Sequence, residues 1–145
     1  MQKMHGAFLM QRNGDDIGMF FIDNDKTIHL TRGDVASIVA SAKMQNGDVY
    51  TFEEGDVVRF TVFEKKNPSA VLISKDVAAT PGGQDVTISL QQEETKIGEL
   101  ISKPTDYWYE VVLNPDTRPQ TIIGYDDNGA KIFKLYPEGG VYNAG

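Results

Sequence analysis

Few side chains in this sequence could carry out a reaction. His5 and His29 are its only histidines, and it contains no cysteine. A hydrolytic triad needs a base beside its nucleophile, but His29 alternates with Ile28 and Leu30, which is the pattern of a surface residue on a strand. The sequence has no nucleophile elbow, P-loop, Rossmann glycine motif or zinc-protease motif. It therefore predicts no catalytic residues, and an enzyme built from His29 and scattered carboxylates ranks third among the hypotheses for its function.

Two turns rich in oxygen ligands, Asp23-Asn24-Asp25 and Asp126-Asp127-Asn128, are candidate calcium sites. Ca²⁺ takes about six to eight oxygen ligands, and neither turn continues into the full EF-hand loop with its terminal glutamate. Asp and Asn also form Asx turns that need no metal. The sequence thus predicts turns here, with no metal and no cofactor, and leaves Asp23, Asp25, Asp126 and Asp127 as the alternative calcium ligands.

The single tryptophan, Trp108, indicates a possible binding surface. It has the same strand parity as Glu110, so we expect both on a solvent-facing side of a strand. An uncovered indole often marks a binding surface, although a neighbouring loop or the N-terminal segment could also cover it. The candidate contacts for a partner protein or a sugar are Trp108, Tyr125 and Tyr136, with Tyr107 as a further stacking platform for a sugar.

The elements that would position these residues are short strands. Apolar residues alternate in runs separated by turn signals every 8 to 12 residues or so, which is typical of an antiparallel β-sandwich. We expect Tyr107, Tyr109, Val111 and Leu113 to face the core, Asp127-Asn128-Gly129 to close a hairpin, and one short helical turn near residues 93–101. The predicted strands cover residues 19–22, 26–30, 35–42, 49–52, 57–64, 70–77, 86–90, 107–113, 121–126 and 131–136.

Composition limits the possible partners. Lys and Arg number 14 and Asp and Glu number 21, which gives a net charge of −7, so a nucleic-acid backbone would be repelled.

No apolar run approaches the roughly 20 residues that span a bilayer, and the run at residues 7–10 is too short for a signal peptide. We expect no membrane partner and synthesis in the cytoplasm. We also expect one domain, with an arm over residues 1–18, a sandwich over 19–137 and a flexible tail over 138–145.

Four phrases carry a family resemblance: KTIHLTRGD (26–34), YTF (50–52) with GDVVRFTV (55–62), VTISL (86–90) and DYWYEV (106–111). Their order resembles the N-terminal immunoglobulin-like domain of the baseplate upper protein family of phages and prophages of Gram-positive bacteria. The resemblance covers residues from about 20 to 136. It implies an all-β, two-layer immunoglobulin-like sandwich, with Tyr107 as a tyrosine-corner-like residue two places before Tyr109, which stands where antibody domains have a cysteine.

The resemblance also implies a function. We expect a non-enzymatic structural or accessory protein of the virion, which serves as a protein–protein assembly module of the tail or baseplate. Its partners would be other tail proteins and further copies of itself, because edge strands offer unpaired backbone groups. The alternative is a carbohydrate-binding module that uses exposed aromatic residues to attach to a cell-surface glycan.

Overall fold

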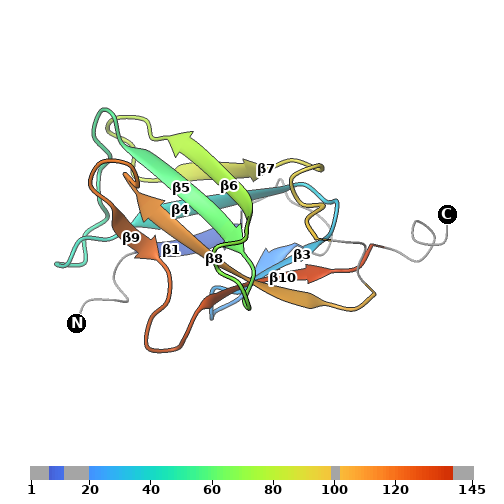
Figure 1. Cartoon of the computed structure of the whole chain (residues 1–145). Coiled ribbons are helices and arrows are strands. Elements are labelled where there is room, and N and C mark those ends of the chain that lie inside the picture. Colours follow the sequence, from blue (N-terminus) through green and yellow to red (C-terminus); the bar gives the residue numbers. More distant parts are fainter. Residues whose placement is uncertain (1–6, 12–19, 99–101, 139–145) are drawn as a thin grey trace.

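The computed structural model describes residues 7–11, 20–98 and 102–138, and these residues form strands and turns but no helix (Figure 1). This confirms the all-β prediction. The strands are β1 (Ala7–Gln11), β2 (Phe21–Ile22), β3 (Ile28–Thr31), β4 (Ala36–Ala42), β5 (Val57–Phe63), β6 (Val71–Ala78), β7 (Val86–Leu90), β8 (Thr105–Leu113), β9 (Gln120–Ile123) and β10 (Lys131–Tyr136).

The strands form two sheets that pack as layers (Figure 1). The smaller sheet has the order β1-β4-β7. The larger has seven strands in the order β2-β3-β10-β8-β5-β6, with β9 paired to β8. The prediction of a wholly antiparallel sandwich is wrong at one place, because β3 and β10 run parallel, with Ile28 opposite Phe133. These two strands are far apart in sequence, so no hairpin constrains their relative direction.

Alternating side chains build one core between the sheets. In β8, the row of Tyr107, Tyr109, Val111 and Leu113 is buried, as predicted, while the residues between them are only partly buried. In β4 of the opposite sheet, Ile38 and Ala40 are fully buried in the same apolar cluster. The period-two pattern of each strand thus separates a core face from an outer face.

The turn at Asp126–Gly129 forms, but it does not join a hairpin of two paired strands. Asp126 and Gly129 exchange backbone hydrogen bonds of 2.9 and 3.1 Å, and Gly129 has a φ of 99°. Beyond this bridge, β9 pairs with the C-terminal half of β8, while β10 pairs with its N-terminal half. The nine-residue β8 is long enough to take both strands on one side, so the predicted hairpin is corrected to two consecutive partners of β8.

Both segments predicted to flank the sandwich contact it within the described residues. Ala7–Gln11, placed in the arm, is strand β1 and pairs with β4, since its apolar run can complete the smaller sheet. Glu138, placed in the tail, binds Arg32 through an ion pair of 3.2 Å. Residues 1–6, 12–19 and 139–145 lie outside the described residues.

Within the described residues, positions 92–98 form no helix, so the predicted helical turn is absent from them. Residues 92–95 form hydrogen-bonded turns, and residues 99–101 lie outside the described part. The Arg32 guanidinium donates to the carbonyl groups of Lys96, Ile97 and Gly98, and fully buried Thr95 accepts a hydrogen bond from the Gly33 amide. These bonds hold the segment in a non-helical course. They also give the Arg32-Gly33-Asp34 turn a structural role.

Candidate functional site on the outer face of the larger sheet

An apolar row crosses four strands on the outer face of the larger sheet. Phe63 in β5 lies opposite Val71 in β6 and opposite Trp108 in β8, and Trp108 lies opposite Ile132 in β10. Directly opposite residues project from the same face of a sheet. The neighbours of these residues along β5, β8 and β10 are buried in the core, so the row itself faces outward. We call Val71, Phe63, Trp108, Ile132 and the adjacent Tyr125 the outer aromatic row.

The aromatic side chains of this row touch one another at steep angles. The Trp108 ring centroid lies 6.4 Å from that of Phe63 and 6.3 Å from that of Tyr125, with interplanar angles of 89° and 71°. Such edge-to-face contacts are a favoured geometry for aromatic pairs. Trp108 is half-buried by its neighbours, whereas Tyr125 and Val71 keep 76% and 53% of their surface exposed.

The structure thus brings two of the predicted contact residues together. Trp108 lies on the outer face, as its parity with Glu110 predicts, and it packs against Tyr125. Sequence reasoning missed Phe63, Val71 and Ile132. The alternation of residues 57–63 predicts that Phe63 faces outward. Its position beside Trp108, however, depends on the register between β5 and β8. The stacking candidate Tyr107 is wrong, because only 7% of its surface is exposed and it faces the core.

Polar groups flank the outer aromatic row on both sides. On one side, Lys134 pairs with Asp106 at 3.2 Å. On the other, Arg59 pairs with Asp76 at 2.7 Å and with Asp116 at 3.1 Å, and these hydrogen bonds raise the pKa of Arg59 while Arg59 lowers the pKa of Asp76. An apolar centre with a polar rim is the usual anatomy of a protein interface.

His29 lies on the same face, one row beyond Trp108, and belongs to a hydrogen-bonded array. Its Nε2 lies 2.9 Å from the Asp23 carboxylate, and its Nδ1 lies 2.8 Å from the Tyr136 hydroxyl. The Phe21 ring stacks on the imidazole at 4.1 Å. His29 thus lies on the outer face of its strand, as its alternation with Ile28 and Leu30 predicts, and its contacts with Asp23 and Tyr136 were not predicted.

This array is a carboxylate, an imidazole and a phenol, the types of group used in proton transfer. Burial raises the pKa of Asp23. The hydrogen bonds from His29 and from the Thr27 and Asp25 amides lower that pKa by more, so the net shift is downward. Asp23, His29 and Tyr136 line none of the three grooves found near residues 42–50, 71–74 and 31–34. The array ties the 23–27 turn to β10.

The two turns proposed as calcium sites use their first carboxylates for other bonds. The Asp23 carboxylate accepts bonds from two backbone amides and contacts His29. The Asp126 carboxylate lies 2.8 Å from the Lys131 ammonium, which lowers the pKa of Asp126, and both side chains are only 7% exposed. Within the described ranges, no group of three or more His, Asp or Glu side chains could hold a metal ion. Asp25 and Asp127, the other two predicted calcium ligands, therefore belong to no such group among the described residues.

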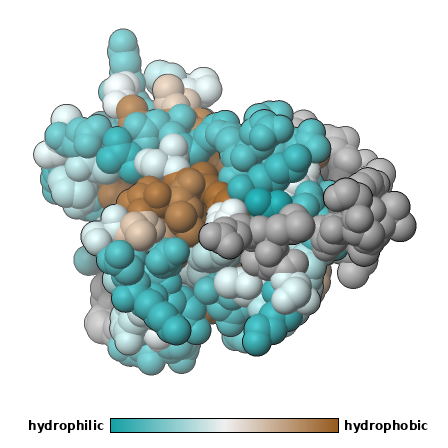
Figure 2. Space-filling view, turned by 45° about the vertical axis from the view of Figure 1, so that its right-hand side comes forward, coloured by the Kyte–Doolittle hydropathy of each residue, from teal (hydrophilic) through white to brown (hydrophobic). Residues whose placement is uncertain are grey.

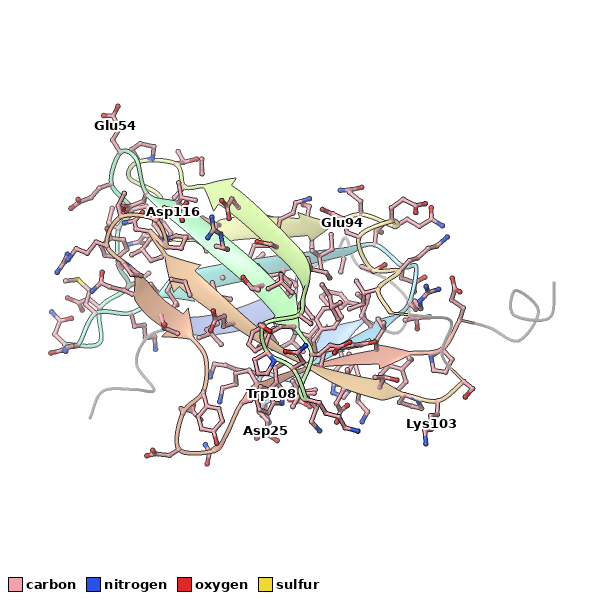
Figure 3. All side chains as sticks on the ribbon, viewed as in Figure 1. Asp25, Glu54, Glu94, Lys103, Trp108 and Asp116 are labelled. Atoms are coloured by element: carbon pink, nitrogen blue, oxygen red, sulfur yellow. The ribbon has the colours of Figure 1, made fainter. Side chains whose placement is uncertain are left out.

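Figure 2 shows an apolar area framed by hydrophilic surface on the side it presents, and Figure 3 labels Trp108 on the larger sheet. The described part of the chain contains no helix that could cross a membrane. Comparison with protein-family models, with curated proteins and with solved structures finds no match. The geometry of the described residues therefore carries the functional argument.

Proposed function

We propose that this chain is a non-enzymatic assembly module that docks another structural protein on its outer aromatic row. Trp108, Phe63 and Ile132 form a preorganised apolar strip, and exposed Tyr125 and Val71 extend it. Aromatic residues are enriched at the energetically dominant positions of interfaces. The charged groups of the ion pairs beside the strip, Lys134 with Asp106 and Arg59 with Asp76, have their counterions within the chain. The resemblance to the baseplate upper protein family makes the tail or baseplate of a phage or prophage the proposed setting.

We further propose an immunoglobulin-like topology for the sandwich. The order β10-β8-β5-β6 follows the succession G-F-C-C′ of variable-type immunoglobulin sheets, and β1-β4-β7 follows the succession A-B-E. Tyr107 lies near the start of β8, and its hydroxyl packs against Gly98 in the preceding segment, where a Cβ would come within 2.6 Å of it. A tyrosine near the start of its strand, with its hydroxyl against the preceding segment, supports the comparison with a tyrosine corner.

The substitution Trp108→Ala tests the docking surface. It removes the centre of the row, and truncation of a dominant aromatic residue typically costs about 2 kcal/mol or more of binding, a loss of about thirtyfold in affinity. Val35→Ala is the matched control, because Val35 is also exposed, at 63%, but precedes β4 of the smaller sheet. Co-purification with the tail proteins of the same genome, quantified by sedimentation velocity, measures the effect.

The expected result is loss of the complex for Trp108→Ala and its retention for Val35→Ala, with circular dichroism spectra unchanged in both. Equal association of wild type and Trp108→Ala with those tail proteins would refute the docking surface. Light scattering on the isolated chain tests the proposed homo-oligomer separately, since a monomer at high concentration together with absence from purified particles contradicts the assembly role.

Carbohydrate binding is the second candidate function, and exposed Tyr125 favours it. Its ring is accessible beside Trp108, and sugars stack on such rings. The two rings meet at 71°, so one flat sugar ring can stack on only one of them. A glycan array separates the two functions, because the carbohydrate hypothesis requires a hit that Tyr125→Ala abolishes.

A further inference from the structure

A groove of about 670 Å³ lies away from the outer aromatic row, between the end of β4 with its following turn and the start of β9. Buried Leu113 and Ile122 contribute to its lining, and exposed polar residues stand on both sides. Ligand sites in proteins commonly measure about 300 to 1,000 Å³ and combine apolar surface with a few convergent polar groups. This groove therefore has the size and the mixed lining of a small-ligand site.

The charge of the groove is opposite to that of the protein. The chain has a net charge of −7, but the charged residues that line this groove are Lys43 and Arg118, both cationic. Lys43 comes from the turn after β4 and Arg118 from the segment before β9, so the two cations stand on separate walls. Within the described residues, the Arg118 guanidinium has no ion pair. The charged side chains that line the groove are thus cationic, while the Asp48 and Asp56 carboxylates bond to its lining residues Asn46 and Tyr50.

Tyr50 gives the groove a fixed aromatic wall. Its hydroxyl donates to the Asp56 carboxylate at 2.7 Å, and its ring packs edge-on against Phe52 at 5.4 Å. The hydrogen bond to Asp56 raises the pKa of Tyr50 to about 12, while the nearby charge of Arg118 opposes this rise. The hydroxyl is therefore neutral and already bonded, so the contribution of Tyr50 to a ligand is its ring.

The remaining polar lining consists of neutral hydrogen-bonding groups. The amides of Gln45 and Gln120 and the hydroxyl of Thr121 are exposed along the groove, whereas the Asn46 amide is already bonded to Asp48. Amides both donate and accept hydrogen bonds, which suits ligands with several hydroxyl groups. The guanidinium of an arginine binds carboxylate or phosphate oxygens through two parallel hydrogen bonds.

We propose that this groove binds an anionic carbohydrate. Arg118 takes its acidic group, the amides of Gln45 and Gln120 bind its hydroxyl groups, and the Tyr50 ring packs against its apolar face. The shared chemistry is a polyhydroxylated ligand with a carboxylate or phosphate. The site is separate from the outer aromatic row, so it goes beyond the proposed assembly role and can fail without it.

Isothermal titration calorimetry with galacturonic acid oligomers, glycerol phosphate polymers and neutral galactose oligomers tests the site. We expect saturable binding of one of the two anionic probes, weakened by added salt, and no binding of the neutral probe. Binding of the first probe assigns a carboxylate ligand, and binding of the second assigns a phosphate ligand. Arg118→Gln should weaken binding about tenfold or more, since hydrogen bonds to charged groups contribute about 1.5 to 3 kcal/mol.

Lys103→Gln is the matched control, because it removes the same charge from an exposed lysine that Figure 3 places at the opposite end of the molecule from β9. It should leave binding unchanged. No binding of either anionic probe, equal weakening by Lys103→Gln and Arg118→Gln, or equal binding of the neutral probe would each overturn the proposal. Preference for an acidic peptide over both probes would overturn the carbohydrate assignment as well.

Discussion

The ion pair between Asp126 and Lys131 offers a sharp test of how the sandwich is stabilised. Lys131 begins the inward row of β10, ahead of buried Phe133 and Leu135, and lies opposite Tyr109 in β8. Its ammonium reaches the Asp126 carboxylate at 2.8 Å, and both side chains are only 7% exposed. The substitution Asp126→Asn keeps the volume of the side chain but removes the negative charge, so Lys131 remains buried without a counterion.

We expect this substitution to lower the free energy of unfolding by about 3 kcal/mol. Removal of one partner of a buried ion pair costs about 3 to 5 kcal/mol, and the lower end applies because the pair lies at the rim of the core. That loss is large beside the roughly 5 to 15 kcal/mol that stabilises a domain. At about 3 °C per kcal/mol for a chain of this size, the melting temperature should fall by about 9 °C.

Urea unfolding followed by Trp108 fluorescence measures the change, with the midpoint shifted and the slope unchanged. The effect should depend on pH with a defined sign. Lys131 holds the pKa of Asp126 below its ordinary value, so the carboxylate contributes stability above the ordinary carboxyl pKa of about 4 and loses it as the pH falls through its lowered pKa. Wild type and Asp126→Asn should therefore converge in acid.

Two controls isolate the ion pair. Asp116→Asn removes a carboxylate that pairs with Arg59 but is 77% exposed, so its effect should stay within about 0.5 kcal/mol. The double variant Asp126→Asn with Lys131→Met should recover most of the loss, because an apolar residue extends the inward row. A loss for Asp126→Asn no larger than that for Asp116→Asn, at neutral pH, would refute the reasoning.

Two further predictions concern the segment before β8. Gly98→Ala should destabilise the protein by about 2 kcal/mol or more, because Gly98 has a φ of 67° and a Cβ there would lie 2.6 Å from the Tyr107 hydroxyl. Thermal unfolding measures this loss. Adding Tyr107→Phe to the Gly98→Ala variant should restore part of the lost stability. Thr95→Val should cost about 1 to 3 kcal/mol in urea unfolding, because the fully buried hydroxyl bonds both the Gly33 amide and the Asp34 carbonyl. A neutral result for Thr95→Val would mean that water replaces these bonds.

The local sequence predicted most strands because the alternation of apolar residues depends only on near neighbours. The 57–64 and 86–90 runs became β5 and β7, and the core row of β8 was read from its parity alone. The helical turn near 93–101 was predicted from the spacing of Ile97 with two later residues. It failed in the described residues because the long-range hydrogen bonds of Arg32 and Thr95 fix that segment.

The outer position of Trp108 was also determined by the sequence, since strand parity places it on the face opposite the core. Its neighbours were decided by tertiary structure. Phe63 and Ile132 come to Trp108 from β5 and β10 only through the registers of those strands with β8. Register depends on contacts between residues distant in sequence, which no local pattern specifies.

The same reason explains what the histidine and the acidic turns do. The sequence gives the residue types of Asp23, His29 and Tyr136, but the parallel pairing of β3 with β10 brings the last of them to the imidazole. Asp126 was predicted as a turn residue, and only the inward direction of Lys131 makes it half of a buried ion pair. Local chemistry thus determines the faces of the strands, and long-range pairing determines which side chains meet on them.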